Sequence, residues 1–179
     1  MVDLYIASVP TEALVEELSR RGAVPQCACE RKAAAPRWPL VIPAPCDWAN
    51  SNQRQHWAAK AKLVKQWRAE TVNRARAASL PTGLARVRID ILLRFTTKHR
   101  RDALNYEPTI KGVVDGLCRD KTHVNKKGDL VKAPGYGLIW DDEPKFLDGP
   151  FPRVGEPVDG ERYPRGVMQL LITEIGGAA

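Results

Sequence analysis

The residues best suited to chemistry in this sequence are carboxylates in two separate segments. Asp102 lies just past the end of a predicted strand, and Asp141 and Asp142 are neighbours further along the chain. Carboxylates from two segments can converge on Mg²⁺, a hard cation that prefers oxygen ligands. Such a metal activates water and stabilises charge on a phosphate. Lys111 and Asp115 share a helix face because they are four residues apart. The alternative is a capping Asp102, a solvated aspartate turn and a surface Lys111–Asp115 pair.

Basic charge is concentrated in one part of the chain. The 179 residues carry a net charge of +7, but residues 54–101 contain thirteen Lys or Arg and only two acids and therefore carry +11. The rest of the chain carries −4. A basic segment that holds phosphates beside clustered acids suits a metal-dependent nuclease, whereas the alternative is a solvated basic helix with unrelated surface acids. The candidate DNA-binding residues in this segment are Arg54, Lys60, Lys65, Arg68, Arg100 and Arg101.

Several segments predict strands. Residues 85–95 alternate between apolar and polar side chains, which is typical of a half-buried strand. Residues 38–43 form a short apolar run closed by prolines, which indicates an edge strand. Residues 166–175 predict the last strand, and a further short strand is expected over 145–148, followed by a loop over 149–165.

Two further segments predict helices. Residues 55–79 have apolar residues at helical spacing, including Trp57 and Trp67, which we expect in the core. Residues 109–117 predict a second helix. Residues 118–137 are polar and predict either a hairpin or a flexible excursion. This order of elements predicts an α+β fold, a small mixed sheet with two helices packed on one face.

Four short motifs follow one another along the chain: RRDALN at 100–105, PTIK at 108–111, DGL at 115–117 and WDD at 140–142. A polar loop and basic helix begin near Asn50, and a last strand ends near Glu174. In this order the motifs resemble the signature of the RusA-type Holliday-junction resolvases, and the resemblance covers roughly residues 38–175.

This resemblance implies a RusA-like domain over 37–179 that nicks four-way DNA junctions symmetrically as a homodimer and requires Mg²⁺, with Mn²⁺ as a substitute. The catalytic acids of the family would fall on Asp102 and Asp142, with Asp141 as a further metal ligand. The important lysine would be Lys111, which stabilises the phosphate or the leaving group. Asn105 matches an asparagine beside the acidic site and is expected to contact DNA. A two-fold dimer suits a two-fold junction.

One position departs from the family pattern. The family has a second acid two residues after the first, and this chain has Leu104 there. Leucine neither binds a metal nor carries a proton, so Glu107, Asp115 or Asp141 would have to compensate. Otherwise the protein binds junctions or branched DNA and cuts poorly. A third possibility is a nuclease for other branched DNA intermediates.

Two regions have no counterpart in the family pattern. Residues 118–137 look like an insertion, which either contacts DNA arms through its lysines or is simply exposed. Residues 1–36 predict a short helix and a linker of unassigned role. Cys27 and Cys29 could form a zinc site together with another cysteine or His123. The alternative is that the cysteines are ordinary thiols. The chain shows neither a signal sequence nor a run of about 20 apolar residues, so we expect a cytoplasmic protein of a bacterial cell or a phage-infected host.

Overall fold

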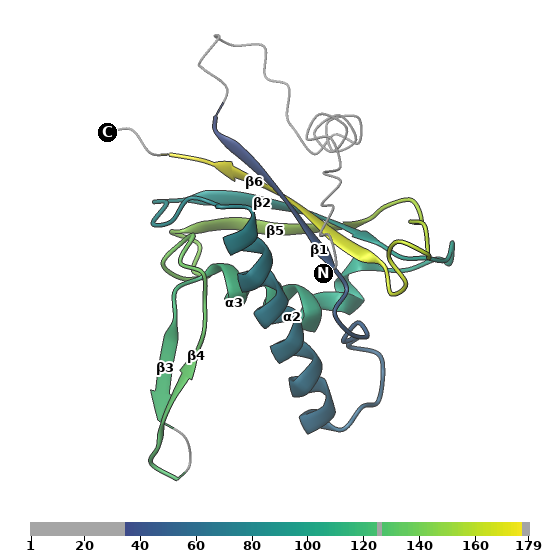
Figure 1. The fold of residues 1–179 in the computed structure, drawn as a ribbon, viewed down its shortest axis with the longest axis horizontal. Helices are drawn as coiled ribbons and strands as arrows, with labels where there is room; N and C mark the ends of the chain where they lie inside the picture. The colour runs from purple at the N-terminus through teal and green to yellow at the C-terminus, as the bar shows by residue number, and fades with distance from the viewer. Residues whose placement is uncertain (1–34, 125–126, 177–179) are drawn as a thin grey trace, which may run out of the picture. The chain divides into compact units, whose positions relative to one another are not determined.

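The main sheet has four strands in the order β1-β6-β2-β5 (Figure 1). In the computed structural model, which describes residues 35–124 and 127–176, β6 (Val167–Glu174) pairs antiparallel with both β1 (Arg37–Pro43) and β2 (Val87–Arg94). β5 (Leu147–Val154) pairs parallel with β2. The sheet is therefore mixed, and β1 lies at its edge as the sequence predicts.

The strand β2 is more deeply buried than its sequence pattern predicts. Val87, Ile89, Ile91 and Leu93 point into the core as expected, but Asp90 on the other face is also only 4% exposed. β2 is a central strand with a neighbour on each side, and Leu92, on the same face as Asp90, is only 1% exposed. The buried Asp90 carboxylate accepts two hydrogen bonds from Arg88, each 2.9 Å long, which satisfy its charge.

The prediction for β5 was wrong in its extent. A strand over 145–148 and a loop over 149–165 were expected, but the strand continues to Val154 through Pro150 and Pro152. β5 is an edge strand with a register shift opposite Arg88 and Asp90. Proline is tolerated at such an edge because the missing N–H does not have to pair with a neighbour.

Both helices lie on the same side of the sheet (Figure 1). Helix α2 spans Trp57–Ala77, and α3 spans Glu107–Leu117 after the 3₁₀ turn η1 (Ala103–Tyr106). The described chain thus has an α+β fold. Trp67 is fully buried as predicted, but the prediction for Trp57 was wrong, because its side chain is 75% exposed. Trp57 is the first residue of α2 and lies beyond the part of the helix that packs on the sheet.

The polar segment after α3 contains a hairpin that forms a second, two-stranded sheet. β3 (Lys121–Val124) pairs antiparallel with β4 (Leu130–Ala133). The Arg68 side chain of α2 fixes the base of this hairpin by donating to the carbonyl oxygens of Ala133 and Pro134, at 3.3 and 2.8 Å. The prediction of a hairpin is therefore confirmed.

The remaining regions need only brief description. Contacts between Cα atoms divide the chain into residues 1–35 and 36–179. Cys27 and Cys29 lie outside the described residues, whereas Cys46 and Cys118 are buried free thiols. Burial raises the pKa of the Cys118 thiol to about 12. Among the helices that the structure describes, none has the length and apolar character needed to cross a membrane.

Two glycines allow α2 and α3 to approach closely. A Cβ atom on Gly116 would lie 2.8 Å from the carbonyl oxygen of Arg68 and 2.9 Å from the Cβ of Thr71. A Cβ on Gly112 would lie 2.9 Å from the carbonyl oxygen of Val64. These contacts involve backbone atoms, which cannot rotate away as a flexible side chain can. The position of α3, and of Lys111 and Asp115 on it, depends on this crossing.

We predict that Gly116→Ala lowers the free energy of unfolding by about 1–3 kcal/mol, because the added methyl group overpacks the crossing. Equilibrium unfolding in urea measures the change. Gly160→Ala is the matched control, since the nearest heavy atom to its added Cβ would be 3.7 Å away. Equal stability of the Gly116→Ala variant and the unmodified protein would contradict this account of the helix crossing.

Candidate functional site

Five charged side chains from three segments meet at one end of the domain. Lys111 and Asp115 lie on α3, Lys121 is the first residue of β3, and Asp141 and Asp142 lie in the segment before β5. We call this set the charge cluster. A parallel bridge between Cys118 and Ile139 brings the end of α3 beside the segment that carries the two aspartates.

The two lysines bind all three aspartates of the charge cluster. Lys121 Nζ lies 2.7 Å from Asp141 Oδ1, 3.4 Å from Asp142 Oδ1 and 3.7 Å from Asp115 Oδ1. Lys111 Nζ lies 2.6 Å from Asp142 Oδ2 and 3.6 Å from Asp115 Oδ1. Carboxylate oxygens from α3 and from the segment before β5 therefore surround the Lys121 ammonium group.

These contacts shift the acidities of the cluster. The hydrogen bond from Lys111 holds the pKa of Asp142 well below its usual range, and the contact with Asp141 adds to this effect. The hydrogen bonds to Asp142 and Asp141 raise the pKa of Lys111 and of Lys121, respectively. The three aspartates and two lysines together carry a formal charge of −1, so the cluster favours a further cation.

Asp102, which the sequence resemblance assigns to catalysis, caps the 3₁₀ turn η1. Its Oδ1 accepts a hydrogen bond of 3.0 Å from the backbone N–H of Leu104. Within the described residues, no hydrogen bond or ion pair joins Asp102 to Asp142. The side chain of Leu104 is 69% exposed. The structure thus brings Lys111, Asp141 and Asp142 together but leaves Asp102 in a capping role.

The donor atoms of the charge cluster suit a hard divalent cation, although the side chains are arranged around ammonium groups. In the part of the chain that the structure describes, no three His, Cys, Asp or Glu side chains are arranged as a ready metal site. The Lys121 ammonium nevertheless lies within 3.7 Å of three aspartate oxygens. Oxygen-only surroundings are those that Mg²⁺ prefers, so a metal could bind if Lys121 moved away.

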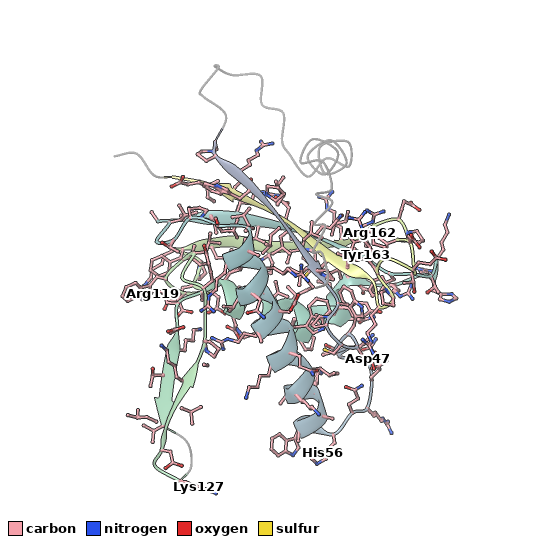
Figure 2. The ribbon with its side chains drawn as sticks, viewed as in Figure 1. Asp47, His56, Arg119, Lys127, Arg162 and Tyr163 are labelled. Carbon is pink, nitrogen blue, oxygen red and sulfur yellow. The ribbon has the colours of Figure 1, made fainter. Side chains whose placement is uncertain are left out.

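The predicted DNA-binding residues differ in how freely they can reach a ligand. Arg54, Lys65 and Arg100 are exposed, and Lys60 is half-buried on α2. Figure 2 shows His56 at the start of this helix, where its Nδ1 accepts from Ala58 N at 3.3 Å. These side chains can contact phosphates as they stand.

The side chains of two other predicted contacts, Arg68 and Arg101, are engaged within the protein, and a third residue, Asn105, is bound through its backbone. Arg68 holds the base of the hairpin. Arg101 donates to Thr97 O and Thr97 Oγ1, both at 2.8 Å, and stacks on Phe95. The Asn105 backbone oxygen accepts from Ser51 N at 2.7 Å.

From the sequence, Lys121 was one of the lysines of residues 118–137 that either contact DNA arms or are simply exposed, and the structure places it among the aspartates. Sequence reasoning missed Arg119, whose guanidinium carbon lies 3.8 Å above the centre of the Trp140 ring. Arg119 and Lys121 both follow closely after α3, which carries Asp115. This proximity is the only signal in the sequence that could have placed them near the aspartates. Compared with known proteins, the chain matches no protein-family model and no curated protein sequence.

The lowered pKa of Asp142 predicts a pH-dependent contribution to stability. Because the folded pKa lies below the ordinary value of 3.8, this contribution is present above about pH 4 and is lost as the pH falls further. We expect the stability difference between the unmodified protein and Asp142→Asn to shrink between pH 6 and pH 3. Urea unfolding at a series of pH values measures it, with Asp47→Asn, whose side chain is 84% exposed, as the control for loss of a carboxylate. A difference that grows toward low pH would contradict the assignment.

Proposed function

We propose that this protein is a Mg²⁺-dependent, structure-selective endonuclease that binds four-way DNA junctions and nicks them symmetrically as a homodimer, with a RusA-like fold. The observation that carries the proposal is the charge cluster, in which Lys111 pairs with Asp142 at 2.6 Å and the Asp142 backbone N–H donates to Asp141 Oδ1 at 2.8 Å. These are three of the residues to which the sequence resemblance assigns catalysis or metal binding. The +11 segment over 54–101 supplies the positive charge that a DNA backbone requires.

Asp141 and Asp142 would hold the metal ion, and Asp115 is the best candidate to compensate for Leu104. Asp115 contacts the same lysines as Asp142, whereas Glu107 is exposed at the start of α3. A bound Mg²⁺ would lower the pKa of water and stabilise charge on the scissile phosphate. Asp102 retains a place in the proposal through the sequence resemblance alone.

Lys111 would act on the phosphate itself. Its ammonium group is 2.6 Å from Asp142, and its side chain is 56% exposed, so it is held by the site and still accessible to a ligand. The raised pKa keeps Lys111 positively charged at neutral pH. A fixed positive charge beside the scissile bond stabilises the negative charge that develops on the phosphate or on the leaving oxygen.

A homodimer follows from the symmetry of the substrate. Two identical active sites related by a two-fold axis can cut opposed strands of a junction that has the same symmetry. The cluster belongs to a single chain, so each copy would bring one complete site.

A second candidate function is binding of junctions or branched DNA without efficient cleavage. Two observations favour it. Leu104 occupies a position where the resemblance predicts an acid, and the three aspartates of the charge cluster are already paired with two lysines. Metal binding would have to displace at least Lys121, which costs affinity.

We predict that Asp142→Asn and Asp102→Asn each lower the rate of Mg²⁺-dependent junction nicking by at least about 100-fold while junction binding persists, because a metal ligand is lost. Single-turnover cleavage of a labelled four-way junction measures the rate, and a gel-shift assay in EDTA measures binding. Asp47→Asn is the control for a missing carboxylate. Unchanged nicking in both variants would refute the assigned catalytic residues.

The same assay separates the two candidate functions through Leu104→Asp. An exposed leucine can be replaced without opening a cavity, so the variant should fold normally. Nicking that appears only in Leu104→Asp would identify the natural protein as a binding protein that lacks one acid. Nicking by the unmodified protein would identify an active nuclease, and cleavage of flaps in preference to four-way junctions would point to other branched substrates.

We also predict that junction affinity falls steeply with salt, and that Lys65→Ala reduces the slope of log K against log [salt] by about 1, since one phosphate contact is lost. Lys145→Ala is the matched control, because this lysine is 63% exposed, lies outside the basic segment and pairs with Glu143. A slope that is the same for Lys65→Ala and the unmodified protein would show that this face of α2 does not contact the backbone.

A further inference from the structure

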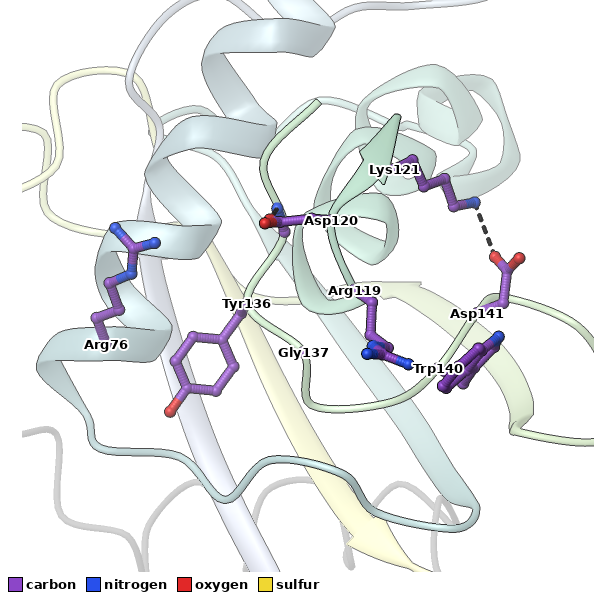
Figure 3. Close-up of a pocket in the computed structure, with 9 residues that line it drawn as sticks. Arg76, Arg119, Asp120, Lys121, Tyr136, Gly137, Trp140 and Asp141 are labelled. Carbon is purple, nitrogen blue, oxygen red and sulfur yellow. Dashed lines mark hydrogen bonds and ion pairs between the residues drawn. The ribbon is translucent and has the colours of Figure 1, made fainter. Parts of the chain in front are cut away.

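A pocket of about 700 Å³ adjoins the charge cluster (Figure 3). It lies between the last turn of α2 and the segment that leads to Asp141. Figure 3 shows Arg76 and Tyr136 on one side and Arg119 and Trp140 on the other, with the Lys121–Asp141 pair beyond Trp140. The pocket and the charge cluster share Lys121 and Asp141, so a ligand in the pocket would lie directly beside the proposed reaction site.

The floor of the pocket is held in place by hydrogen bonds. Tyr136 N donates to Gly116 O and Gly137 N to Cys118 O, both at 2.9 Å. Gly135 N donates to Asp120 Oδ1 at 2.8 Å, and the Tyr136 hydroxyl donates to Leu80 O. The Tyr136 ring is therefore a fixed wall, and a ligand would not have to order this segment when it binds.

Trp140 presents an aromatic surface to solvent at the mouth of the pocket. Its side chain is 59% exposed although it follows the buried Leu138 and Ile139. The Arg119 guanidinium stacks over the ring, as arginine does on aromatic faces. An aromatic ring paired with a planar cation is a stacking platform for a nucleobase, whichever base it is.

Two arginine side chains, Arg76 and Arg119, also line the pocket. Within the described residues, neither Arg76 nor Arg119 forms an ion pair with a carboxylate. Lys121 and Asp120 are already paired, with Asp141 and Lys132, respectively. Two guanidinium groups on opposite walls thus remain able to bind a phosphate.

We propose that this pocket binds an unpaired nucleobase, together with its phosphate, from the DNA strand that is positioned for cleavage. The base stacks on Trp140 and Arg119, and Arg76 binds the phosphate. This proposal rests on the proposed function, since it concerns the same site and the same DNA. Holding one base outside the helix at the branch point would place the adjoining phosphate beside Lys111 and Asp142, and it would favour junctions over intact duplex, in which unstacking a base is costly.

The test uses the full chain and four-way junctions in EDTA, so that no cleavage occurs. Each junction carries 2-aminopurine at one position next to the crossover, because the fluorescence of this base reports loss of stacking. We compare the unmodified protein with Trp140→Ala, Trp140→Phe and Trp57→Ala. Trp57 is the matched control, as it is exposed but does not line the pocket. Circular dichroism establishes that each variant is folded.

For the unmodified protein, we expect a fluorescence change at one position, and we expect Trp140→Ala to abolish it and weaken junction binding by about 5- to 100-fold. Trp140→Phe should retain most of the signal, and Trp57→Ala should retain all of it. Replacing the reporting base with an abasic site should remove the difference in affinity between the unmodified protein and Trp140→Ala.

The proposal is overturned if Trp140→Ala and the unmodified protein bind the junction equally and give the same fluorescence. It is also overturned if their difference in affinity persists with the abasic junction, or if thymidine 5′-phosphate binds in a Trp140-dependent way while the junction signal does not depend on Trp140. In these cases junction binding itself persists, so the proposed function stands. Absence of any junction binding by the unmodified protein would overturn both.

Discussion

Three aspartates can lie side by side only if positive charge lies between them, and this constraint organises the charge cluster. Two lysine ammonium groups meet it, one from α3 and one from the start of β3. Because Lys121 is the first residue of the hairpin, its ion pairs tie the hairpin to α3 and to the segment before β5. The glycine-mediated crossing of α2 and α3 then fixes where the basic helix lies relative to these acids.

Much of the fold was predictable from periodicity, and the exceptions have physical causes. The apolar residues of β2 and those around Trp67 recur with the period of a strand and of a helix, because one side of each element packs in the core. A local sequence pattern is enough to predict such an element. Trp57 has the same spacing but lies beyond the edge of the core, and local sequence does not show where a core ends. The prolines of β5 suggested a loop, because only the position of this strand at the sheet edge makes them acceptable.

The candidate site was predictable in part for a related reason. Asp141, Asp142 and Lys111 stood out through their types and their order in the motifs. The role of Lys121 was missed because its contacts with Asp115 and Asp141 are made across the fold and leave no periodic trace in the sequence. Asp102 caps η1, and the exposed Leu104 lies within this turn. The departure from the family pattern therefore falls on a side chain that faces solvent.

The central claim is that the oxygens now bound to Lys121 form the site of a divalent cation. A crystal structure of the protein soaked in Mn²⁺, with anomalous scattering recorded, tests this most directly. The account predicts one strong anomalous peak from an Mn²⁺ ion that Asp141 and Asp142 bind, with the Lys121 ammonium group moved out of contact with both carboxylates. Absence of a peak at this site, with the Lys121–Asp141 ion pair intact at saturating Mn²⁺, would contradict it.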